Sequence, residues 1–169
     1  MSDSLPGTGR RVGLLALQGG VAEHAELLHS LGAEVVLVKK PTHLKGLNAL
    51  VLPGGESSTI DRLTRILGVR DALIEAISGG LPTLGTCAGL IMLSREISDP
   101  APGQQSLGLL DVTVDRNAFG SQVSSAETVL NWQSATGESR QVKAAFIRAP
   151  RVVRAGKGVE VTARYQGEI

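Results

Sequence analysis

A lone thiol stands between two glycines near the middle of the chain. Cys87 is the only cysteine of the sequence, and it occupies the pattern Gly-x-Cys-x-Gly with Gly85 and Gly89. An apolar run precedes this pattern and apolar residues at helical spacing follow it over residues 90–97, which is the layout of a nucleophile elbow. The glycines allow the turn, because a Cβ at either position would crowd the neighbouring backbone. N–H groups at the start of the helix would stabilise the thiolate. The pattern therefore predicts a nucleophilic cysteine, and an inert buried cysteine is the alternative.

A second glycine-rich turn, Pro53-Gly54-Gly55-Glu56-Ser57, also follows an apolar run. In open α/β sheets, ligands bind outside the carboxyl ends of the strands. Two adjacent glycines let backbone N–H groups approach a ligand closely. We therefore predict an oxyanion hole formed by Gly54, Gly55 and the N–H of Ala88, which follows the proposed nucleophile. Taken alone, the glycine pair would indicate an ordinary strand-to-helix turn, and the cysteine elbow is what favours the catalytic interpretation.

The elements that must hold these turns alternate between strands and helices. Short apolar runs predict buried strands at residues 11–17, 34–38, 49–52 and directly before Gly85. Apolar residues at helical spacing predict one helix between the first two strands and two helices between the third strand and the elbow, the first of these two with Ser57 or Ser58 as its N-cap. A polar loop joins the second strand to the third. Strands alternating with helices imply βαβ units, a parallel sheet and right-handed crossovers.

The second half of the chain changes character. Strands are predicted at residues 109–114, 121–131, 142–147 and 159–165, with no helices between them. This pattern favours a mainly antiparallel β extension on a parallel α/β core. No linker, internal repeat or low-complexity segment divides the chain, so residues 1–169 are predicted to form a single domain.

The composition argues against several classes of function. Seventeen Lys and Arg residues balance sixteen Asp and Glu residues, so the net charge of +1 does not indicate a nucleic-acid or membrane partner. A single cysteine permits no internal disulfide, which fits a reducing cytoplasm. The N-terminal residues lack the apolar segment of a signal peptide, and no apolar run approaches the ~20 residues of a membrane span. His, Cys and carboxylate residues do not cluster at metal-ligand spacing. We expect a cytoplasmic protein with neither metal nor cofactor.

Five segments, in this order along the chain, carry a resemblance to a known family. They are Leu17-Gln18-Gly19, Pro53-Gly54-Gly55-Glu56-Ser57-Ser58-Thr59, Gly85-Thr86-Cys87-Ala88-Gly89-Leu90-Ile91, Arg116-Asn117-Ala118-Phe119-Gly120-Ser121-Gln122 and Phe146-Ile147-Arg148-Ala149-Pro150. From Val12 to its C-terminus the chain resembles the glutaminase subunit of pyridoxal 5′-phosphate synthase, a class I, triad-type glutamine amidotransferase. The elbow alone indicates the amidotransferase class, whereas the last two segments select this subunit. The resemblance implies a three-layer, doubly wound, flavodoxin-like fold with a mostly parallel sheet.

The resemblance also implies roles for individual residues. Cys87 would attack the side-chain carboxamide of L-glutamine, release ammonia and form a glutamyl thioester that water hydrolyses. The family positions that bind glutamine match Gly55, Glu56, Ser57, Arg116, Ile147 and Arg148. Arginine suits the substrate carboxylate, because its fork donates two parallel hydrogen bonds. Without the family, Arg116 would be interpreted as a solvated surface charge.

The family also implies a partner. Ammonia would pass to a synthase subunit, a (β/α)8 barrel that builds pyridoxal 5′-phosphate (vitamin B6) from a pentose phosphate and a triose phosphate. The family forms a complex of twelve synthase and twelve glutaminase subunits. Whether the glutaminase works without its partner is a question that the residues leave open.

One part of the family's machinery has no counterpart in these residues. In the family, a histidine oriented by a glutamate activates the cysteine, and both belong to a C-terminal His-Pro-Glu segment. The histidines here are His24, His29 and His43, and none matches that segment. We expect His24 and His29 on the solvated side of the first helix, and His43, in a loop at the same sheet edge as the elbow, is a weak candidate for a substitute base. To explain the missing His-Pro-Glu segment, we favour a longer natural chain that carries it. The alternative is a subunit that truly ends here.

Three classes of function remain in competition. The leading hypothesis is a glutaminase that supplies ammonia to pyridoxal phosphate synthesis. The second is a catalytically defective subunit, which would dock on the barrel partner without glutamine turnover. The third is another elbow-cysteine hydrolase on the same fold, such as a stress-related protease or deglycase. Those enzymes place a carboxylate near the thiol and lack the Arg-Asn-x-Phe-Gly and Ile-Arg-Ala-Pro segments, so the third hypothesis ranks last.

Overall fold

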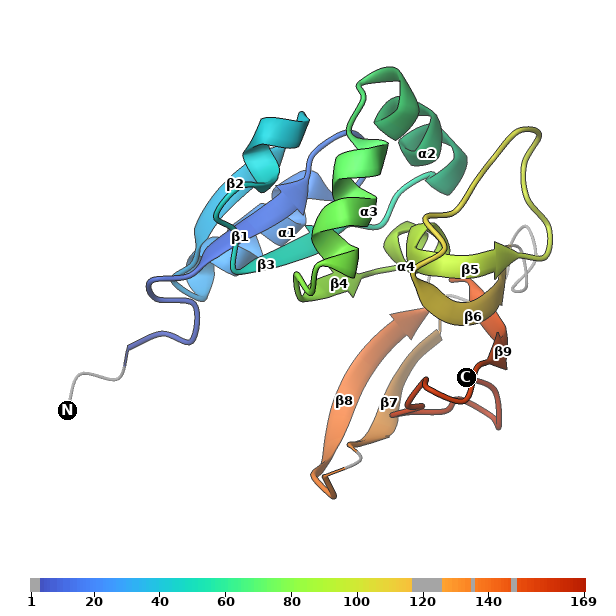
Figure 1. Ribbon diagram of the computed structural model, residues 1–169. Helices are drawn as coiled ribbons and strands as arrows, with labels where there is room; N and C mark the ends of the chain where they lie inside the picture. Colours follow the sequence, from blue (N-terminus) through green and yellow to red (C-terminus); the bar gives the residue numbers. More distant parts are fainter. Residues whose placement is uncertain (1–3, 117–125, 135, 147–148) are drawn as a thin grey trace.

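The core of the protein is a four-stranded parallel sheet, called sheet A below. The computed structural model describes residues 4–116, 126–134, 136–146 and 149–169. Sheet A has the strand order β2-β1-β3-β4, and each neighbouring pair is parallel (Figure 1). The strands are β1 (Arg11–Leu15), β2 (Glu34–Val38), β3 (Ala49–Leu52) and β4 (Thr83–Gly85). The predicted parallel sheet is confirmed, with β1 and β3 at its centre.

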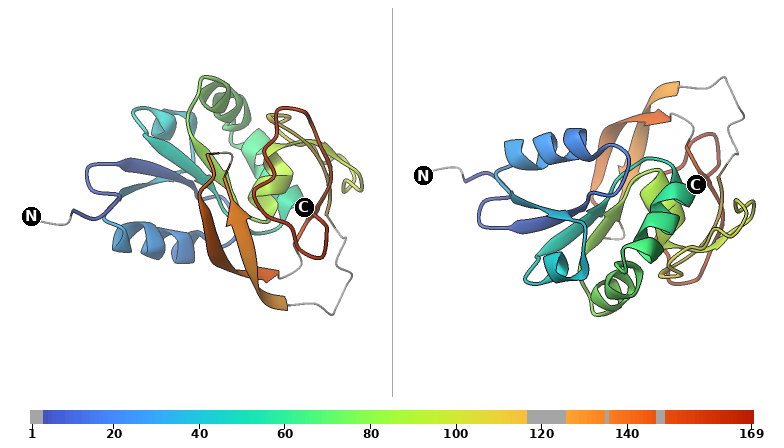
Figure 2. Two further views of the ribbon diagram at one scale, coloured as in Figure 1. Left: turned by 90° about the horizontal axis from the view of Figure 1, so that it is seen from below. Right: turned by 90° about the horizontal axis from the view of Figure 1, so that it is seen from above.

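Helices cover both faces of sheet A. They are α1 (Val21–Ser30), the short 3-10 helix η1 (Pro41–Leu44), α2 (Ser57–Ile66), α3 (Arg70–Ser78) and α4 (Ala88–Leu93). Leu14 and Val51 pack in the layer beneath α1, whereas Leu15, Leu50 and Leu52 belong to the core shared with α2, α3 and α4. Successive strand residues point to opposite faces, so a strand between two helical layers needs a continuous apolar run. Figure 2 shows α1 on one side of the sheet and α2 and α3 on the other, which confirms the three-layer α/β class.

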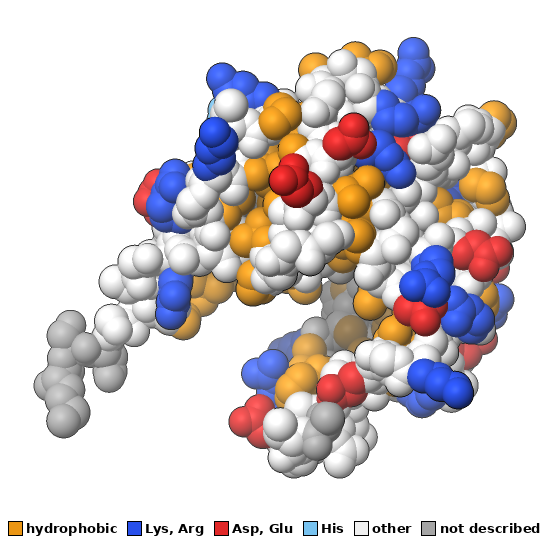
Figure 3. Space-filling view, viewed as in Figure 1, with side chains coloured by type: hydrophobic (Ala, Val, Ile, Leu, Met, Phe, Trp, Pro, Cys, Tyr) orange, Lys and Arg blue, Asp and Glu red, His pale blue; other side chains and the backbone are white. Residues whose placement is uncertain are grey.

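The second half of the chain forms two small sheets beside this core. Sheet B has the order β5-β6-β9, and the other two strands form the hairpin β7–β8. The strands are β5 (Ser94–Ile97), β6 (Leu110–Asp115), β7 (Ala126–Gln133), β8 (Ser139–Phe146) and β9 (Arg151–Ala155). The pairs β6–β9 and β7–β8 are antiparallel and β5–β6 is parallel. The hairpin projects from the body in Figure 1, and Figure 3 shows an open notch beside it. A mainly antiparallel extension is therefore confirmed.

An ion cluster ties the strands of sheet B together at the surface. Asp111 on β6 accepts a hydrogen bond of 2.7 Å from Arg154 on β9 and lies 3.4 Å from Arg95 on β5. The hydrogen bond from Arg154, followed by the charges of Arg95 and Arg154, holds the pKa of the Asp111 carboxyl below its ordinary value, although desolvation opposes this. Each of the three strands thus contributes one charge to the cluster.

Two predicted boundaries in the first half are wrong. The strand predicted at residues 11–17 ends at Leu15, and the helix after the elbow ends at Leu93 instead of continuing to residue 97. At Ser94 the backbone leaves the helical region, and the buried Ser94 hydroxyl donates to the Ile91 carbonyl at 2.8 Å. The apolar Ile97, which suggested a longer helix, instead packs into the core beneath sheet B.

The predicted strand at residues 159–165 is also wrong. Among the described residues it forms a single isolated β-bridge, between Tyr165 and Glu168, and one backbone hydrogen bond of 2.7 Å, from the Gln133 N–H to the Thr162 carbonyl. Val159 packs against the core beneath sheet B, so its apolar character reflects packing and not strand formation. The antiparallel partner of β6 is instead β9, which we did not predict because Arg151 and Arg154 interrupt any alternation. Residues 121–125 and 147, predicted as parts of strands, lie outside the described residues.

In the described part of the chain, no helix combines the length and the apolar character that crossing a membrane would require.

Candidate active site

Cys87 lies in the turn between β4 and α4, at the carboxyl edge of sheet A. It is a free, half-buried cysteine, and it caps the N-terminus of α4 with φ of 48° and ψ of −105°. A positive φ is uncommon for a residue with a side chain and costs on the order of 1–3 kcal/mol. The structure therefore holds Cys87 in a strained strand-to-helix turn, which is the geometry of a nucleophile elbow.

Close backbone packing explains both glycines of the elbow. A Cβ on Gly89 would lie 2.0 Å from the carbonyl oxygen of Leu52, at the end of β3. A Cβ on Gly85 would lie 2.7 Å from the carbonyl group of Gly89. Both distances are shorter than the 3.0 Å below which real Cβ contacts essentially never occur. The predicted reason for the two glycines is confirmed, and α4 begins directly against the end of β3.

The glycine turn after β3 lies beside the cysteine. A Cβ on Gly54 would lie 3.4 Å from the Cβ of Cys87. The first turn of the chain, residues 18–20, holds this glycine turn from the other side. The Gly20 N–H donates to the Gly54 carbonyl at 3.0 Å, and the Glu56 N–H donates to the Gln18 carboxamide oxygen at 2.8 Å. Three turns that follow strands, at residues 18–20, at residues 53–57 and at the elbow, therefore meet at one place.

His24 connects the first turn to the elbow. It is half-buried on α1, with Nδ1 at 2.6 Å from the Gly20 carbonyl oxygen and Nε2 at 3.1 Å from the Thr86 hydroxyl. A carbonyl oxygen only accepts, so the ring donates from Nδ1, and in the neutral ring Nε2 accepts from Thr86. The expectation of a solvated His24 is wrong, because Thr86 comes from a turn that the periodicity of α1 does not reveal.

The other two histidines lie away from the elbow. His29 is exposed on α1, as expected. His43 lies in η1, where its Nδ1 is 2.9 Å from the Leu37 carbonyl oxygen and 3.3 Å from the Lys39 nitrogen. Both contacts lie at the end of β2. Strands β2 and β4 are the two outermost strands of sheet A, on opposite sides of β1 and β3. Three strand spacings, about 14 Å, separate the two edges. His43 therefore has no access to Cys87 as a substitute base.

Glu56 and Ser57 open helix α2 at the same edge of the sheet. Glu56, and not Ser57 or Ser58 as predicted, is the N-cap, because its carboxylate accepts the Ser58 N–H at 3.3 Å and the Ser58 hydroxyl at 3.0 Å. Ser57 is the first residue of the helix and is buried. Its hydroxyl accepts a hydrogen bond of 2.9 Å from the Gln104 carboxamide nitrogen, so it is committed to the loop that faces α2.

Arg116 lies close to Glu56 and Ser57. Its backbone N–H donates to the Asp99 carboxylate at 2.7 Å, and its side chain is only 17% exposed. The guanidinium Nη1 donates to the Gln104 carboxamide oxygen and lies 3.9 Å from the Glu56 carboxylate. The interpretation of Arg116 as a solvated surface charge is therefore wrong. The structure brings three predicted glutamine-binding residues together, and Gln104 stands between two of them.

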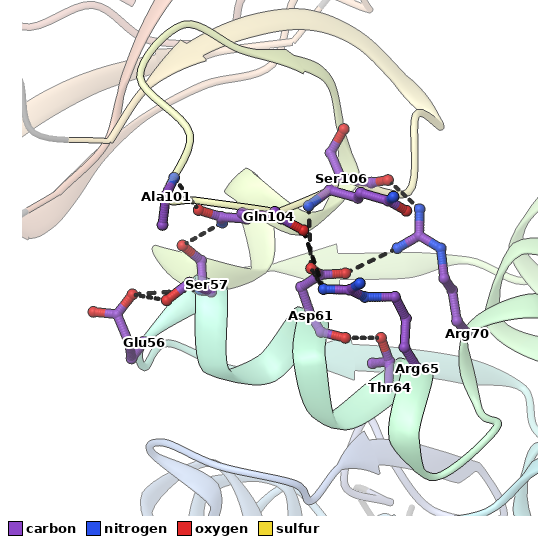
Figure 4. A network of polar contacts seen from close by, with 12 residues as sticks. Glu56, Ser57, Asp61, Thr64, Arg65, Arg70, Ala101, Gln104 and Ser106 are labelled. Carbon is purple, nitrogen blue, oxygen red and sulfur yellow. Dashed lines mark hydrogen bonds and ion pairs between the residues drawn. The ribbon is translucent and has the colours of Figure 1, made fainter.

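A buried carboxylate holds the loop that carries Gln104 (Figure 4). Asp61 on α2 is fully buried and pairs with Arg65 at 2.8 Å and Arg70 at 3.1 Å. It also accepts the Gln105 N–H at 3.1 Å. Buried charges need partners of this kind, because desolvation otherwise makes them very costly.

Sequence reasoning missed Asp61 although a signal existed. Ser57, Ile60, Asp61 and Thr64 share the buried face of α2 at the spacing i, i+3, i+4, i+7. Polar residues on the core face of a helix indicate a buried polar network. Gln18 and Gln104, by contrast, lie in a turn and a loop, where no periodic pattern would have distinguished them.

Some predicted site residues cannot be placed. Ile147 and Arg148 lie outside the described residues, as do residues 117–125. Gly54 and Ala88 both adjoin Cys87, the first across the turn and the second along the chain. Within the described parts of the chain, no group of three or more His, Cys, Asp or Glu residues could hold a metal ion.

A doubly wound parallel sheet with a cysteine elbow at its carboxyl edge defines a class of α/β enzymes that includes the glutamine amidotransferases. The fold is similar to one solved structure described as a glutamine amidotransferase, with a TM-score of 0.82 and 47% sequence identity. The match covers 93% of this chain and 81% of that chain. Residues 14–169 match the SNO glutamine amidotransferase family, and the chain belongs to this family.

Curated relatives carry a more specific name. A Cutibacterium acnes protein is 51% identical over 93% of this chain and 77% of its own length. A Leifsonia xyli protein is 53% identical over 91% and 77%, and a Thermotoga neapolitana protein is 46% identical over 94% and 82%. All three are named pyridoxal 5′-phosphate synthase subunit PdxT. The resemblance derived from the five sequence segments is therefore confirmed.

Proposed function

We propose that this protein is a glutaminase that supplies ammonia to pyridoxal 5′-phosphate synthesis. It hydrolyses L-glutamine to L-glutamate and ammonia. The observation that carries the proposal is the position of Cys87, in a strained elbow whose side chain adjoins the Gly54-Gly55 turn. Membership of the SNO glutamine amidotransferase family and the name shared by the relatives support the same activity.

The reaction proceeds by two acyl transfers. The sulfur of Cys87 attacks the side-chain carbonyl carbon of glutamine, the carbon–nitrogen bond breaks, and the protonated nitrogen leaves as ammonia. Water then attacks the thioester carbon, the carbon–sulfur bond breaks, and glutamate leaves with the thiol restored. Both steps pass through a tetrahedral oxyanion. We assign its stabilisation to the N–H groups of Gly54, Gly55 and Ala88.

Each transfer also needs a group that accepts and returns a proton. Among the described residues no histidine bonds to the Cys87 thiol, because the rings of His24 and His43 bond elsewhere and His29 is exposed. The family resemblance gives this task to a histidine and a glutamate in a His-Pro-Glu segment, which these 169 residues do not contain.

The binding of glutamine divides between backbone and side chains. We assign it to Gly55, Glu56, Ser57, Arg116, Ile147 and Arg148. Of these, Arg116 is the residue suited to the substrate carboxylate, because a guanidinium donates two parallel hydrogen bonds to it. Its position 3.9 Å from Glu56 supports a common pocket for the two side chains.

The proposal extends to the assembly. Residues 1–169 act as a single glutaminase domain, and ammonia passes directly to a barrel-shaped synthase subunit in a complex of twelve copies of each subunit. The protein works in the cytoplasm, without a metal or cofactor of its own and without a nucleic-acid or membrane partner. The balanced charge of the sequence supports these last assignments.

A substitution of the nucleophile tests the activity. Cys87→Ala should reduce glutamate release, measured with the synthase partner present, by roughly a thousandfold or more. Undiminished release would refute the assignment of the nucleophile. Gly158→Ala is the matched control, because its Cβ would meet no described atom within 4 Å.

The same assay distinguishes a glutaminase from a catalytically defective subunit that only docks on the synthase. An unaltered protein that binds the synthase subunit but releases no glutamate would be a docking subunit and not a glutaminase. Co-sedimentation with the synthase subunit measures the binding.

A further inference from the structure

We infer that Gln104 is a specificity-determining positioning residue, which holds the Arg116 guanidinium ready for the α-carboxylate of glutamine. The inference rests on the proposed function and deepens it, because no motif of the family resemblance includes the loop between β5 and β6. Gln104 is half-buried in that loop, between α2 and the end of β6.

The carboxamide of Gln104 is held in one orientation by hydrogen bonds at both its oxygen and its nitrogen. Its oxygen accepts from the Arg116 Nη1 and from the Ala101 N–H at 3.1 Å, and its nitrogen donates to the Ser57 hydroxyl at 2.9 Å. A carboxamide oxygen only accepts and a carboxamide nitrogen only donates, so a flipped group would oppose Arg116 donor to donor. The side chain therefore links the start of α2 to Arg116 in a single arrangement.

The backbone on both sides of Gln104 is held just as firmly (Figure 4). Arg65 donates to the Gly103 carbonyl at 3.2 Å, and Arg70 donates to the Ser106 carbonyl at 2.5 Å. The Gln105 N–H donates to Asp61, which pairs with both arginines. The flexible side chain of Gln104 is thereby ordered before a ligand arrives, which lowers the conformational entropy lost when the ligand binds.

The neutrality of Gln104 is what makes this arrangement suitable for binding an anion. A carboxylate at position 104 would neutralise Arg116 and occupy its fork, whereas a carboxamide positions the guanidinium and leaves its positive charge available. Glu56 lies 3.9 Å from the guanidinium and is 51% exposed, so it compensates the charge only weakly, whereas the Asp99 carboxylate accepts the Arg116 backbone N–H at 2.7 Å. Among the described residues, the buried Arg116 Nε has no hydrogen-bond partner.

The decisive test is binding to the inactive Cys87→Ala protein, measured by calorimetry with two ligands. L-Glutamine carries the α-carboxylate, and L-glutamine α-methyl ester lacks that negative charge. Gln104→Ala should weaken the binding of glutamine by about tenfold, the usual effect of losing the support of one charge-assisted hydrogen bond. The affinity for the methyl ester should stay within about twofold of the parent, because the ester gains little from a positioned guanidinium.

Gln104→Glu sharpens the test, since it keeps the size of the side chain and can still accept from Arg116 and from the Ser57 hydroxyl. It should weaken glutamine binding more than Gln104→Ala does, because it neutralises Arg116. Gln105→Ala is the matched control: the adjacent side chain is exposed, and only its backbone N–H takes part in the network. Thermal melting of each variant reports whether the fold is retained.

Equal losses for both ligands would show that Gln104 is merely structural and would overturn the inference. Unchanged glutamine affinity in Gln104→Glu would overturn it as well. Failure of the parent Cys87→Ala protein to bind glutamine at all would instead refute the proposed function, and this inference with it. A selective loss for glutamine in both Gln104 variants, with Gln105→Ala unchanged, is the result that we expect.

Discussion

The two sides of the candidate site are held in place by different means. Around Cys87 the backbone itself is packed against backbone, and Gly89 leaves no space for even one added carbon beside Leu52. Around Arg116 the contacts are polar and run through side chains, from buried Asp61 across the loop to Gln104. The nucleophilic role that we propose for the Cys87 sulfur requires placement within tenths of an ångström, which rigid backbone packing achieves. The charge of a ligand is recognised by a long side chain, and such a side chain needs partners that immobilise it.

The largest loss of stability is expected when the polar contacts around Asp61 are removed. Asp61→Ala should destabilise the protein by about 3–5 kcal/mol, because it removes the buried counter-charge of Arg70 and of the partly exposed Arg65. Urea unfolding measures the change. Asp71→Ala on the exposed surface of α3 is the control and should stay within about 0.5 kcal/mol of the parent. A loss below about 1 kcal/mol for Asp61→Ala would mean that the cluster is not needed for stability.

A somewhat smaller loss of stability is expected when a side chain is added at Gly89, where backbone packs against backbone. Gly89→Ala should cost about 1–3 kcal/mol, because a Cβ at 2.0 Å from the Leu52 oxygen forces α4 away from β3. The displaced elbow should also alter the rate at which iodoacetamide alkylates Cys87, which mass spectrometry follows. Gly158→Ala, whose Cβ meets nothing in the described residues within 4 Å, should change neither quantity. Identical stability and alkylation in Gly89→Ala would contradict the packing argument.

The smallest effect is expected when the contact between the elbow and helix α1 is removed. Thr86→Val removes the hydroxyl that bonds to His24 while keeping the shape of the side chain, and should cost about 1 kcal/mol in urea unfolding. Thr86→Ser, which retains the hydroxyl, should recover most of that stability. If both variants are equally stable, the contact between His24 and Thr86 contributes nothing, and the elbow is held by its glycines alone.

This contrast also explains how much of the site was predictable. The elbow is readable from Gly85, Cys87 and Gly89, because local backbone geometry demands glycine wherever chains approach closely. His24 was misjudged, since its partner Thr86 lies 62 residues away in the sequence and only the closed sheet brings them together. Gln104 lies in an irregular loop, and its role depends on contacts with α2 and Arg116 that no spacing encodes.

The fold was likewise predictable in one part of the chain and not in another. The parallel sheet follows from uninterrupted apolar runs, because strands covered on both faces need them. In the second half the same reasoning failed at residues 159–165, where Val159 packs against the core without forming a strand, and at β9, whose arginines conceal a strand. Alternating patterns are weak where a strand is short and half-exposed, so pairing partners decide the outcome there.

The meeting of the three strand-end turns has a consequence for how the protein folds. Gly20, Gly54 and Thr86 are far apart in the chain, and their contacts exist only after β3 has joined β1 and β4 has joined β3. Parallel pairings of such high contact order form slowly, because the loop-closure entropy must be met before the contacts are gained. A nascent or refolding chain therefore holds Cys87 as an ordinary exposed thiol until the last strand of sheet A is in place. The reactivity that we propose for Cys87 therefore arises late, together with the turns that surround it.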